Sequence, residues 1–198
     1  FHEDLPLSAM QAGADMAATS VHKLGGSMTQ SSVLNVREGL VSAKRVQTVL
    51  SMLTTTSTSY PLLASLDTAR RQLAVHGYDL IDDAVRLAKD TRKRINNINH
   101  LYCVGREKLH SSATFDMDPL KLLISVKDLG ITGHQAEEWL RHNANLEVEL
   151  SDLYNILCLV TLGDTKKEMN LLVNALQRMS QAFDSEAVVT ETNVNVPE

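Results

Sequence analysis

The first third of the chain alternates short apolar stretches with polar runs, and this pattern predicts strands joined by a loop. Residues 14–19 and 32–36 are predicted strands, because each is rich in Ala, Val, Leu or Thr and is flanked by turn-forming residues. The segment between them consists largely of Ser, His, Lys, Gly and Thr, a composition typical of a loop. Apolar residues then recur three or four positions apart, which predicts a helix over 44–53.

Two further helices are predicted in the middle of the chain. Pro61 suits the first turn of a helix that continues to about Val75. His76-Gly77 separates it from a second, amphipathic helix over about 80–96. Several cations near the end of this second helix complement its dipole, and we expect them to be solvated rather than ligand-binding: Lys89, Arg92, Lys93 and Arg94.

The remaining pattern predicts a strand-helix-strand-strand-helix order, which is typical of a small α/β domain. The predicted strands cover 121–126, 146–150 and 156–161. We therefore expect the chain to divide near residue 97, with 98–183 forming the small domain and 184–198 a polar tail or linker.

Both helices of this small domain carry start signals. Thr132 is a predicted N-cap with Gln135 in capping-box position, and Asp164 is predicted to cap the closing helix. Apolar residues spaced along the closing helix predict its buried face: Met169, Leu172, Val173, Leu176 and Met179.

Composition excludes several classes of protein. With 198 residues, 43% hydrophobic and 22% charged, the chain is typical of a globular protein rather than a disordered one. A net charge of -5 gives no electrostatic reason to expect nucleic acid or an anionic membrane as a partner. Cys103 and Cys158 stand singly among apolar neighbours, so we expect buried thiols and no metal site. Without a long apolar stretch or a basic signal-peptide start, we expect a cytoplasmic location.

Candidate chemistry is concentrated in residues 18–32. Here Lys23 follows His22 in a stretch rich in hydroxyls and small residues. A lysine in such a setting can act as a nucleophile toward an aldehyde, and hydroxyls with backbone N–H groups can hold a phosphate. The alternative is a surface loop with an incidental His-Lys pair, which is the favoured interpretation for the dipeptide alone.

The longer string resembles the attachment signature for pyridoxal 5′-phosphate (PLP) of the ornithine/lysine/arginine decarboxylase family. The matching positions are Ser20, His22, Lys23, Gly26-Ser27 and Thr29-Gln30-Ser31-Ser32. The resemblance continues through 56–67, 122–133 and 148–157, and covers nearly all the chain up to about residue 183.

This resemblance implies an α/β fold: part of an aspartate-aminotransferase-like PLP-binding large domain over 1–97, followed by the small α/β domain. It implies that Lys23 holds PLP covalently, that His22 lies beside the cofactor and that Ser20 contacts its phosphate. Either Lys23 or His22 would donate a proton to the product.

Other positions have weaker support. Thr58 and Ser59 resemble a segment that reaches the partner subunit's cofactor in this family, which implies a homodimer; the alternative is an ordinary helix N-cap. Glu149, Asp152 and Tyr154 could face a cationic substrate side chain, or serve as loop and capping groups.

The family also carries an acidic partner for the pyridine nitrogen and a histidine that stacks on the ring, and neither has a match in this sequence. The matching part of the large domain is likewise incomplete, so we expect uncovered apolar faces and a poor catalyst when the chain is alone.

Three functions remain open at this stage. The first is decarboxylation of arginine, lysine or ornithine, with arginine marginally preferred, to an amine used for polyamine synthesis. The second is another PLP reaction on the same fold, by an aminotransferase or an aldolase. The third is a non-catalytic dimerisation remnant.

Overall fold

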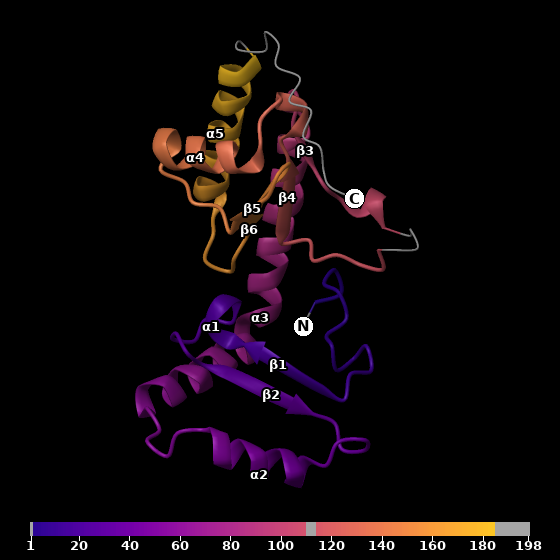
Figure 1. Cartoon of the computed structure of the whole chain (residues 1–198), viewed down its shortest axis with the longest axis vertical. Helices are drawn as coiled ribbons and strands as arrows, with labels where there is room; N and C mark the ends of the chain where they lie inside the picture. The colour runs from indigo at the N-terminus through magenta and orange to yellow at the C-terminus, as the bar shows by residue number, and fades with distance from the viewer. Residues whose placement is uncertain (1, 110–113, 185–198) are drawn as a thin grey trace. The chain divides into compact units, whose positions relative to one another are not determined.

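The computed structural model describes residues 2–109 and 114–184, which form two compact units. Unit 1 is Phe1–Asp82 and unit 2 is Asp83–Glu198, and each is described by itself (Figure 1). The polar tail expected over 184–198 lies outside the described residues, apart from Asp184.

Unit 1 contains the two strands that the sequence predicts near its start. Strands β1 (Met16–Ser20) and β2 (Ser32–Val36) are antiparallel, and Ser20 lies opposite Ser32 in the register. The connection between them was predicted to be a loop, but it begins with a single helical turn, α1 (Val21–Leu24). Lys23 therefore lies on a helical turn directly after a strand.

Helix α2 (Ala43–Leu53) follows the hairpin and confirms the helix predicted there. The Ser42 side chain caps it by accepting a hydrogen bond from Arg45 N at 3.4 Å. Residues of the hairpin, of α2 and of the turn before it line a largely apolar cleft of about 470 Å³: Met16, Leu34, Leu40, Val41, Ser42, Arg45, Val46, Val49 and Leu50.

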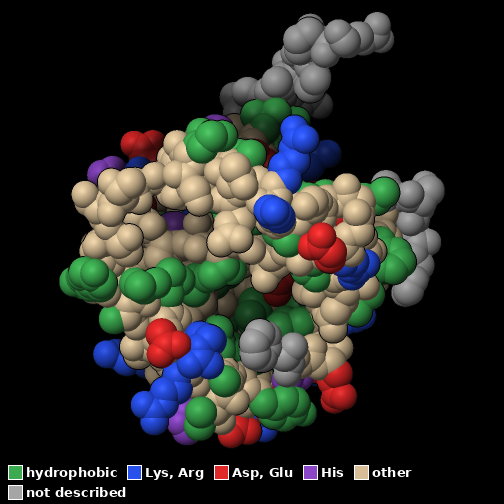
Figure 2. Space-filling model, turned by 90° about the horizontal axis from the view of Figure 1, so that it is seen from below, with side chains coloured by type: hydrophobic (Ala, Val, Ile, Leu, Met, Phe, Trp, Pro, Cys, Tyr) green, Lys and Arg blue, Asp and Glu red, His purple; other side chains and the backbone are tan. Residues whose placement is uncertain are grey.

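Unit 1 exposes large apolar side chains, as expected for an incomplete domain. Leu40 is 91% exposed, Leu53 is 78% exposed and Met52 is 73% exposed. Hydrophobic side chains, in green, reach the surface in several places when the molecule is seen from below (Figure 2).

Helix α3 (Tyr60–Ile95) is continuous, so the predicted break after His76-Gly77 is wrong. Gly77 is buried within the helix. A glycine in a helix interior costs roughly 1 kcal/mol relative to alanine. This cost is too small to end a helix that has packed residues both before and after the glycine. The division of the chain into two units falls within α3, between Asp82 and Asp83, and the domain boundary near residue 97 stays a prediction. In the parts of the chain that the structure describes, no helix is long and apolar enough to cross a membrane.

Unit 2 is built on a four-stranded antiparallel sheet with the strand order β3-β4-β6-β5. The strands predicted over 121–126 and 156–161 are confirmed as β4 and β6. The strand predicted over 146–150 is wrong except at its end, since only Leu150 of that range belongs to β5. The bounds are β3 (Tyr102–Cys103), β4 (Lys121–Ser125), β5 (Leu150–Ser151) and β6 (Asn155–Leu159).

Helix α4 (Gly133–Ala144) begins as the sequence predicts. Thr132 accepts a hydrogen bond from Gln135 N at 3.2 Å, and Gln135 Oε1 accepts one from Thr132 N at 2.8 Å, so the capping box is confirmed.

Helix α5 (Lys166–Asp184) begins one residue later than predicted, with Thr165 as its N-cap. Lys167 N donates to Thr165 Oγ1 at 3.2 Å. Asp164, which was expected to cap the helix, instead accepts from Thr161 N at 2.7 Å. Its carboxylate therefore closes the turn that precedes the helix.

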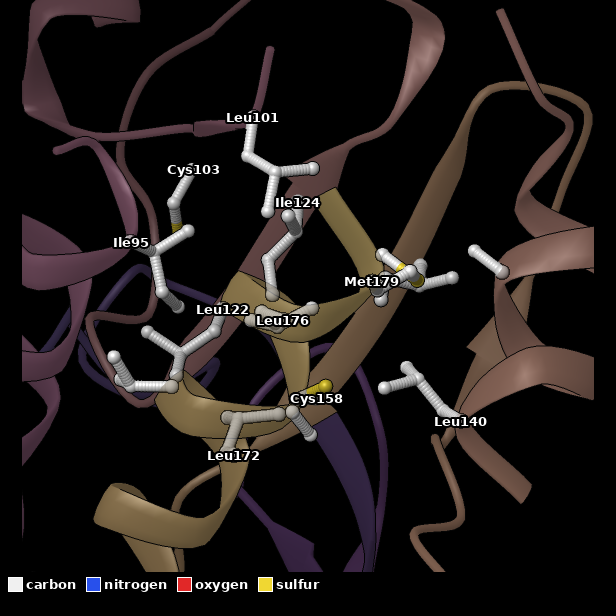
Figure 3. Packing of buried hydrophobic residues seen from close by; sticks show 14 of the residues in the cluster. Ile95, Leu101, Cys103, Leu122, Ile124, Leu140, Cys158, Leu172, Leu176 and Met179 are labelled. Atoms are coloured by element: carbon white, nitrogen blue, oxygen red, sulfur yellow. The ribbon is translucent and has the colours of Figure 1, made fainter. Parts of the chain in front are cut away.

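The core of unit 2 lies between the sheet and its helices (Figure 3). The predicted buried face of α5 is confirmed, and Trp139 packs half-buried against the same core. Cys103 and Cys158 are both buried free thiols, as predicted. Burial raises the pKa of Cys103 to about 11 and that of Cys158 to about 12.

Arg92 is a structural residue, so the expectation that all the cations at the end of α3 are solvated is wrong. Its Nε donates to Val104 O at 2.9 Å, and its Nη2 donates to the carbonyl oxygens of Pro119 at 3.0 Å and Lys121 at 2.9 Å. One guanidinium thus joins α3 to both ends of the segment between β3 and β4.

Candidate active site

Lys23 stands on the exposed turn that follows β1. The strand ends at Ser20, α1 begins at Val21, and the chain returns to the sheet at Ser32. The Lys23 side chain is exposed and forms no hydrogen bond or ion pair with the described residues. Its amine is therefore available to a ligand.

The proton arrangement of His22 follows from its contact with Ser31. Nδ1 of His22 lies 2.8 Å from Ser31 O, and His22 N donates to the same carbonyl oxygen at 3.4 Å. Because a carbonyl oxygen only accepts hydrogen bonds, Nδ1 carries the hydrogen. In the neutral ring, Nε2 is then the nitrogen that can accept a proton.

Ser31 stabilises the turn through the hydrogen bonds of its buried side chain. It is 3% exposed, and its Oγ donates to Met28 O at 2.6 Å. Ser27 Oγ lies 2.6 Å from Ser31 Oγ, and since the single Ser31 hydroxyl hydrogen is directed to Met28, Ser27 is the donor of this pair. The two serines therefore fix the backbone between Lys23 and β2.

The same turn is joined to α3 by one side chain. Met28 N donates to Ser65 Oγ at 3.1 Å. The sequence predicted neither this contact nor a role for Ser65. The only sequence signal is a serine among apolar residues near the start of a predicted helix, and the structure shows this serine to be half-buried.

Ser20 is placed where it could meet a ligand beside Lys23. It precedes α1, yet its side chain makes no capping hydrogen bond to that turn, and it is exposed. Its hydroxyl could therefore donate to an anion.

Thr58 and Ser59 are exposed residues directly before α3. Ser59 O accepts from Leu63 N at 3.1 Å, which is the first hydrogen bond of the helix. Within the described residues, neither side chain forms a hydrogen bond with the Lys23 turn. The structure therefore places them at the helix start, and their contact with a cofactor stays a prediction.

The three candidate substrate residues belong to unit 2, whereas Lys23 belongs to unit 1. Glu149 N donates to Leu157 O at 2.9 Å, so the Glu149 backbone extends the pairing of β5 with β6. Lys127 Nζ lies 5.5 Å from the centre of the Tyr154 ring, a cation–π distance. Their contact with a substrate stays a prediction.

Asp152 already has partners in its own turn. Its Oδ1 accepts from Tyr154 N at 2.8 Å and from Asn155 N at 2.7 Å. The hydrogen bond from the Tyr154 backbone, followed by that from the Asn155 side chain, lowers the pKa of the carboxyl group. Asp152 thus stabilises the β5–β6 connection, whatever else it contacts.

A sequence model of the family described as "Orn/Lys/Arg decarboxylase, major domain" matches residues 1–168. The chain is 66% identical to an arginine decarboxylase of Bacillus anthracis, over 94% of this chain and 38% of that protein. It is 63% identical to an arginine decarboxylase of Bacillus cereus, over the whole chain and 43% of that protein. The chain thus spans about 40% of the length of these curated relatives.

Solved structures share the fold at lower identity. A lysine decarboxylase of Francisella novicida matches with a TM-score of 0.73 and 24% identity, over 86% of this chain and 28% of that one. An alanine–glyoxylate aminotransferase of Nostoc sp. matches with a TM-score of 0.63 and 18% identity, over 87% of this chain and 50% of that one. The expected fold class, α/β with part of an aspartate-aminotransferase-like large domain, is confirmed.

Proposed function

Because the chain belongs to the Orn/Lys/Arg decarboxylase family, we propose that it is the part of an amino-acid decarboxylase that carries the cofactor lysine, Lys23. The observation that carries the proposal is the geometry of the α1 turn. It presents an exposed amine directly after a histidine whose Nδ1 is fixed by Ser31 O.

The residues of this turn fit the chemistry of PLP. An aldehyde needs an accessible primary amine, which Lys23 supplies. A phosphate needs hydrogen-bond donors, and the Ser20 hydroxyl is not used in capping α1. A Cβ at Gly26 would meet no atom within 4 Å, so there is open space beside the turn.

Bound PLP supplies the electron sink that accepts the electron pair of the bond between the α-carbon and the carboxylate. Lys23 would hold the cofactor through its side-chain amine. His22 keeps its Nδ1 hydrogen on Ser31 O, so Nε2 is the atom that can take up a proton and deliver it to the product. Ser20 would hold the phosphate through its hydroxyl.

Arginine is the substrate we propose. The relatives at 60–70% identity are named arginine decarboxylases, whereas the constitutive lysine decarboxylase of Escherichia coli is 24% identical. The expected product is agmatine, a precursor of polyamines.

Other parts of the proposal concern the remaining candidate residues and the location of the protein. Thr58 and Ser59 reach the phosphate of the partner subunit's cofactor in a homodimer. Glu149, Asp152 and Tyr154 contact the guanidinium of the substrate by charge pairing and hydrogen bonding. The protein acts in the cytoplasm.

Borohydride trapping tests the cofactor site. The chain is incubated with PLP, reduced, digested and examined by mass spectrometry. We expect a pyridoxyl group on Lys23, and its loss in a Lys23→Ala variant with Lys44→Ala as an exposed control. Label spread evenly over exposed lysines would contradict the proposed site.

A hybrid enzyme tests the reaction and the substrate. In it, the matching segment of the Bacillus cereus relative is replaced by this chain. We expect release of carbon dioxide and agmatine from arginine, in preference to the amines of lysine and ornithine. A keto-acid product would instead favour an aminotransferase. If neither the isolated chain nor the hybrid enzyme binds PLP, a non-catalytic remnant is favoured.

A further inference from the structure

The turn that carries Lys23 needs an external support. Between Lys23 and Ser32 the backbone twice enters the left-handed region, with φ of +88° at Gly26 and +69° at Gln30. Glycine adopts this conformation freely, but glutamine is strained in it. Such a turn keeps one conformation only when surrounding contacts hold it.

The contacts inside the turn fix its second half. Ser31 joins Met28 and Ser27 through its hydroxyl, and it joins His22 through its carbonyl oxygen. These hydrogen bonds make the conformation of residues 27–31 and the proton arrangement of His22 depend on each other. None of them connects residues 27–31 to α2 or α3.

Ser65 supplies that connection. Its hydroxyl donates to Leu62 O at 2.7 Å, within α3, and accepts from Met28 N at 3.1 Å. The single hydroxyl hydrogen is used within the helix, so the oxygen lone pair is directed to the loop amide. A continuous series of hydrogen bonds therefore runs from α3 through Met28 and Ser31 to His22.

We propose that Ser65 is a positioning residue for the Lys23 turn: it anchors the Met28 amide to α3 and thereby keeps Ser31 O in place for His22. This inference rests on the proposed function for its link to PLP. Ser65 touches neither His22 nor Lys23 in the hydrogen bonds described above, so its effect on the site is indirect.

The chain offers a matched control for the test. Thr68 lies one turn further along α3, and its hydroxyl also donates to a carbonyl oxygen of the preceding helical turn, that of Ala64, at 2.9 Å. Thr68 is exposed and has no hydrogen bond to the turn among the described residues. Ser65→Ala and Thr68→Ala therefore both remove a helix hydroxyl, but only the first removes the anchor.

Amide hydrogen exchange of the full chain, followed by NMR without PLP, is the deciding measurement. We expect Ser65→Ala to speed exchange of the Met28 amide by roughly 2- to 10-fold, the effect of losing one hydrogen bond. Thr68→Ala should leave that rate unchanged, and Ser65→Thr, which keeps the hydroxyl, should restore it. Unchanged exchange in Ser65→Ala, or equal acceleration in Thr68→Ala, would overturn the proposal.

A second measurement links the anchor to the cofactor. At limiting PLP, we expect less borohydride-trapped label on Lys23 in Ser65→Ala than in Thr68→Ala, with recovery in Ser65→Thr. Equal labelling of all three would overturn a positioning role. If the unsubstituted chain and the hybrid enzyme both lack label, the proposed function fails, whereas the hydrogen-exchange comparison still decides whether Ser65 anchors the turn.

Discussion

Arg92 Nε donates a hydrogen bond of 2.9 Å to Val104 O, across twelve residues of sequence. The same guanidinium binds two more carbonyl oxygens, those of Pro119 just before β4 and of Lys121, its first residue. A planar group with five N–H donors can serve several carbonyl oxygens at once, which an ammonium group on a flexible stem does less well. Arg92 thus provides donors to three carbonyl oxygens that lie outside the two-residue strand β3.

Removing the Arg92 guanidinium should destabilise the chain. We expect Arg92→Ala to lower the free energy of unfolding by about 2–4 kcal/mol, because three carbonyl oxygens, among them that of the buried Pro119, lose charged donors. Urea unfolding checks this. Lys93→Ala, at the exposed neighbouring position, should change the value by less than about 0.5 kcal/mol. Similar losses in the two variants would contradict the role given to Arg92.

Gly133, the first residue of α4, has no room for a side chain. A Cβ there would lie 2.1 Å from Asn155 O and 2.4 Å from Asp152 O. Since both obstacles are backbone atoms, we expect Gly133→Ala to lower the free energy of unfolding by about 1–3 kcal/mol. At Gly163, whose Cβ would only meet Thr161 Oγ1 at 3.8 Å, the same change should be tolerated. Thermal unfolding of both variants is the measurement, and a tolerated Gly133→Ala would refute the steric argument.

Asp152 can be tested for its two roles separately. Asp152→Ala should lower the free energy of unfolding by about 1–2 kcal/mol, because the Tyr154 and Asn155 amides lose their acceptor. Asp152→Asn keeps an acceptor oxygen and should largely retain stability. In the hybrid enzyme, a raised KM for arginine in Asp152→Asn would indicate a contact between the charge and the substrate. An unchanged KM would leave Asp152 with its structural role alone.

The lowered pKa of Asp152 also predicts a pH dependence. A carboxyl group whose pKa is lowered by folding stabilises the folded state above its unfolded pKa, and this contribution is lost as the pH falls through the folded value. The loss of stability in acid should therefore be smaller in Asp152→Asn than in the unsubstituted chain. Urea unfolding between pH 6 and pH 3 compares the two, and parallel curves would contradict the expectation.

The buried thiols predict the opposite dependence in alkali. Burial raises the pKa of Cys103 from 9.0 to about 11, so its protonated form is favoured in the folded state. This stabilisation is complete below pH 9 and is lost as the pH rises through about 11, with a size of roughly 2–3 kcal/mol. We expect a weaker decline of unfolding free energy between pH 9 and pH 11 in Cys103→Ala. Equal slopes of unfolding free energy against pH in the two proteins would mean that the thiol ionises as easily in the folded chain as in the unfolded chain.

The sequence predicts elements well where local pattern and packing agree. Residues 32–36 were predicted as a strand and form β2 with the same limits. The run 146–150 has the alternation of a strand, but Leu146 and Val148 pack against the core outside any strand. Asn145 has a φ of +52° and ends α4, and Leu146 N donates back to Leu140 O at 3.2 Å. The alternating apolar residues there pack against the core after the end of α4 and do not form a strand.

The candidate site shows the same limit of prediction from local sequence patterns. The motif identified Lys23 and His22 because they are adjacent and their residue types carry the chemistry. Ser65 lies 37 residues from Met28 in sequence, and their hydrogen bond exists only because the chain folds back onto α3. A pattern of neighbouring residues has no means of predicting such a long-range pairing.

The register of the sheet in unit 2 suggests an order of folding. Leu150 pairs with Leu157, seven residues along the chain, whereas Leu122 pairs with Cys158, which is 36 residues away. Closing a short loop loses less chain entropy and is faster than bringing distant strands together. We expect the β5–β6 hairpin, with Asp152 at its turn, to form first and to offer the edge of β6 as a template on which β4 later pairs.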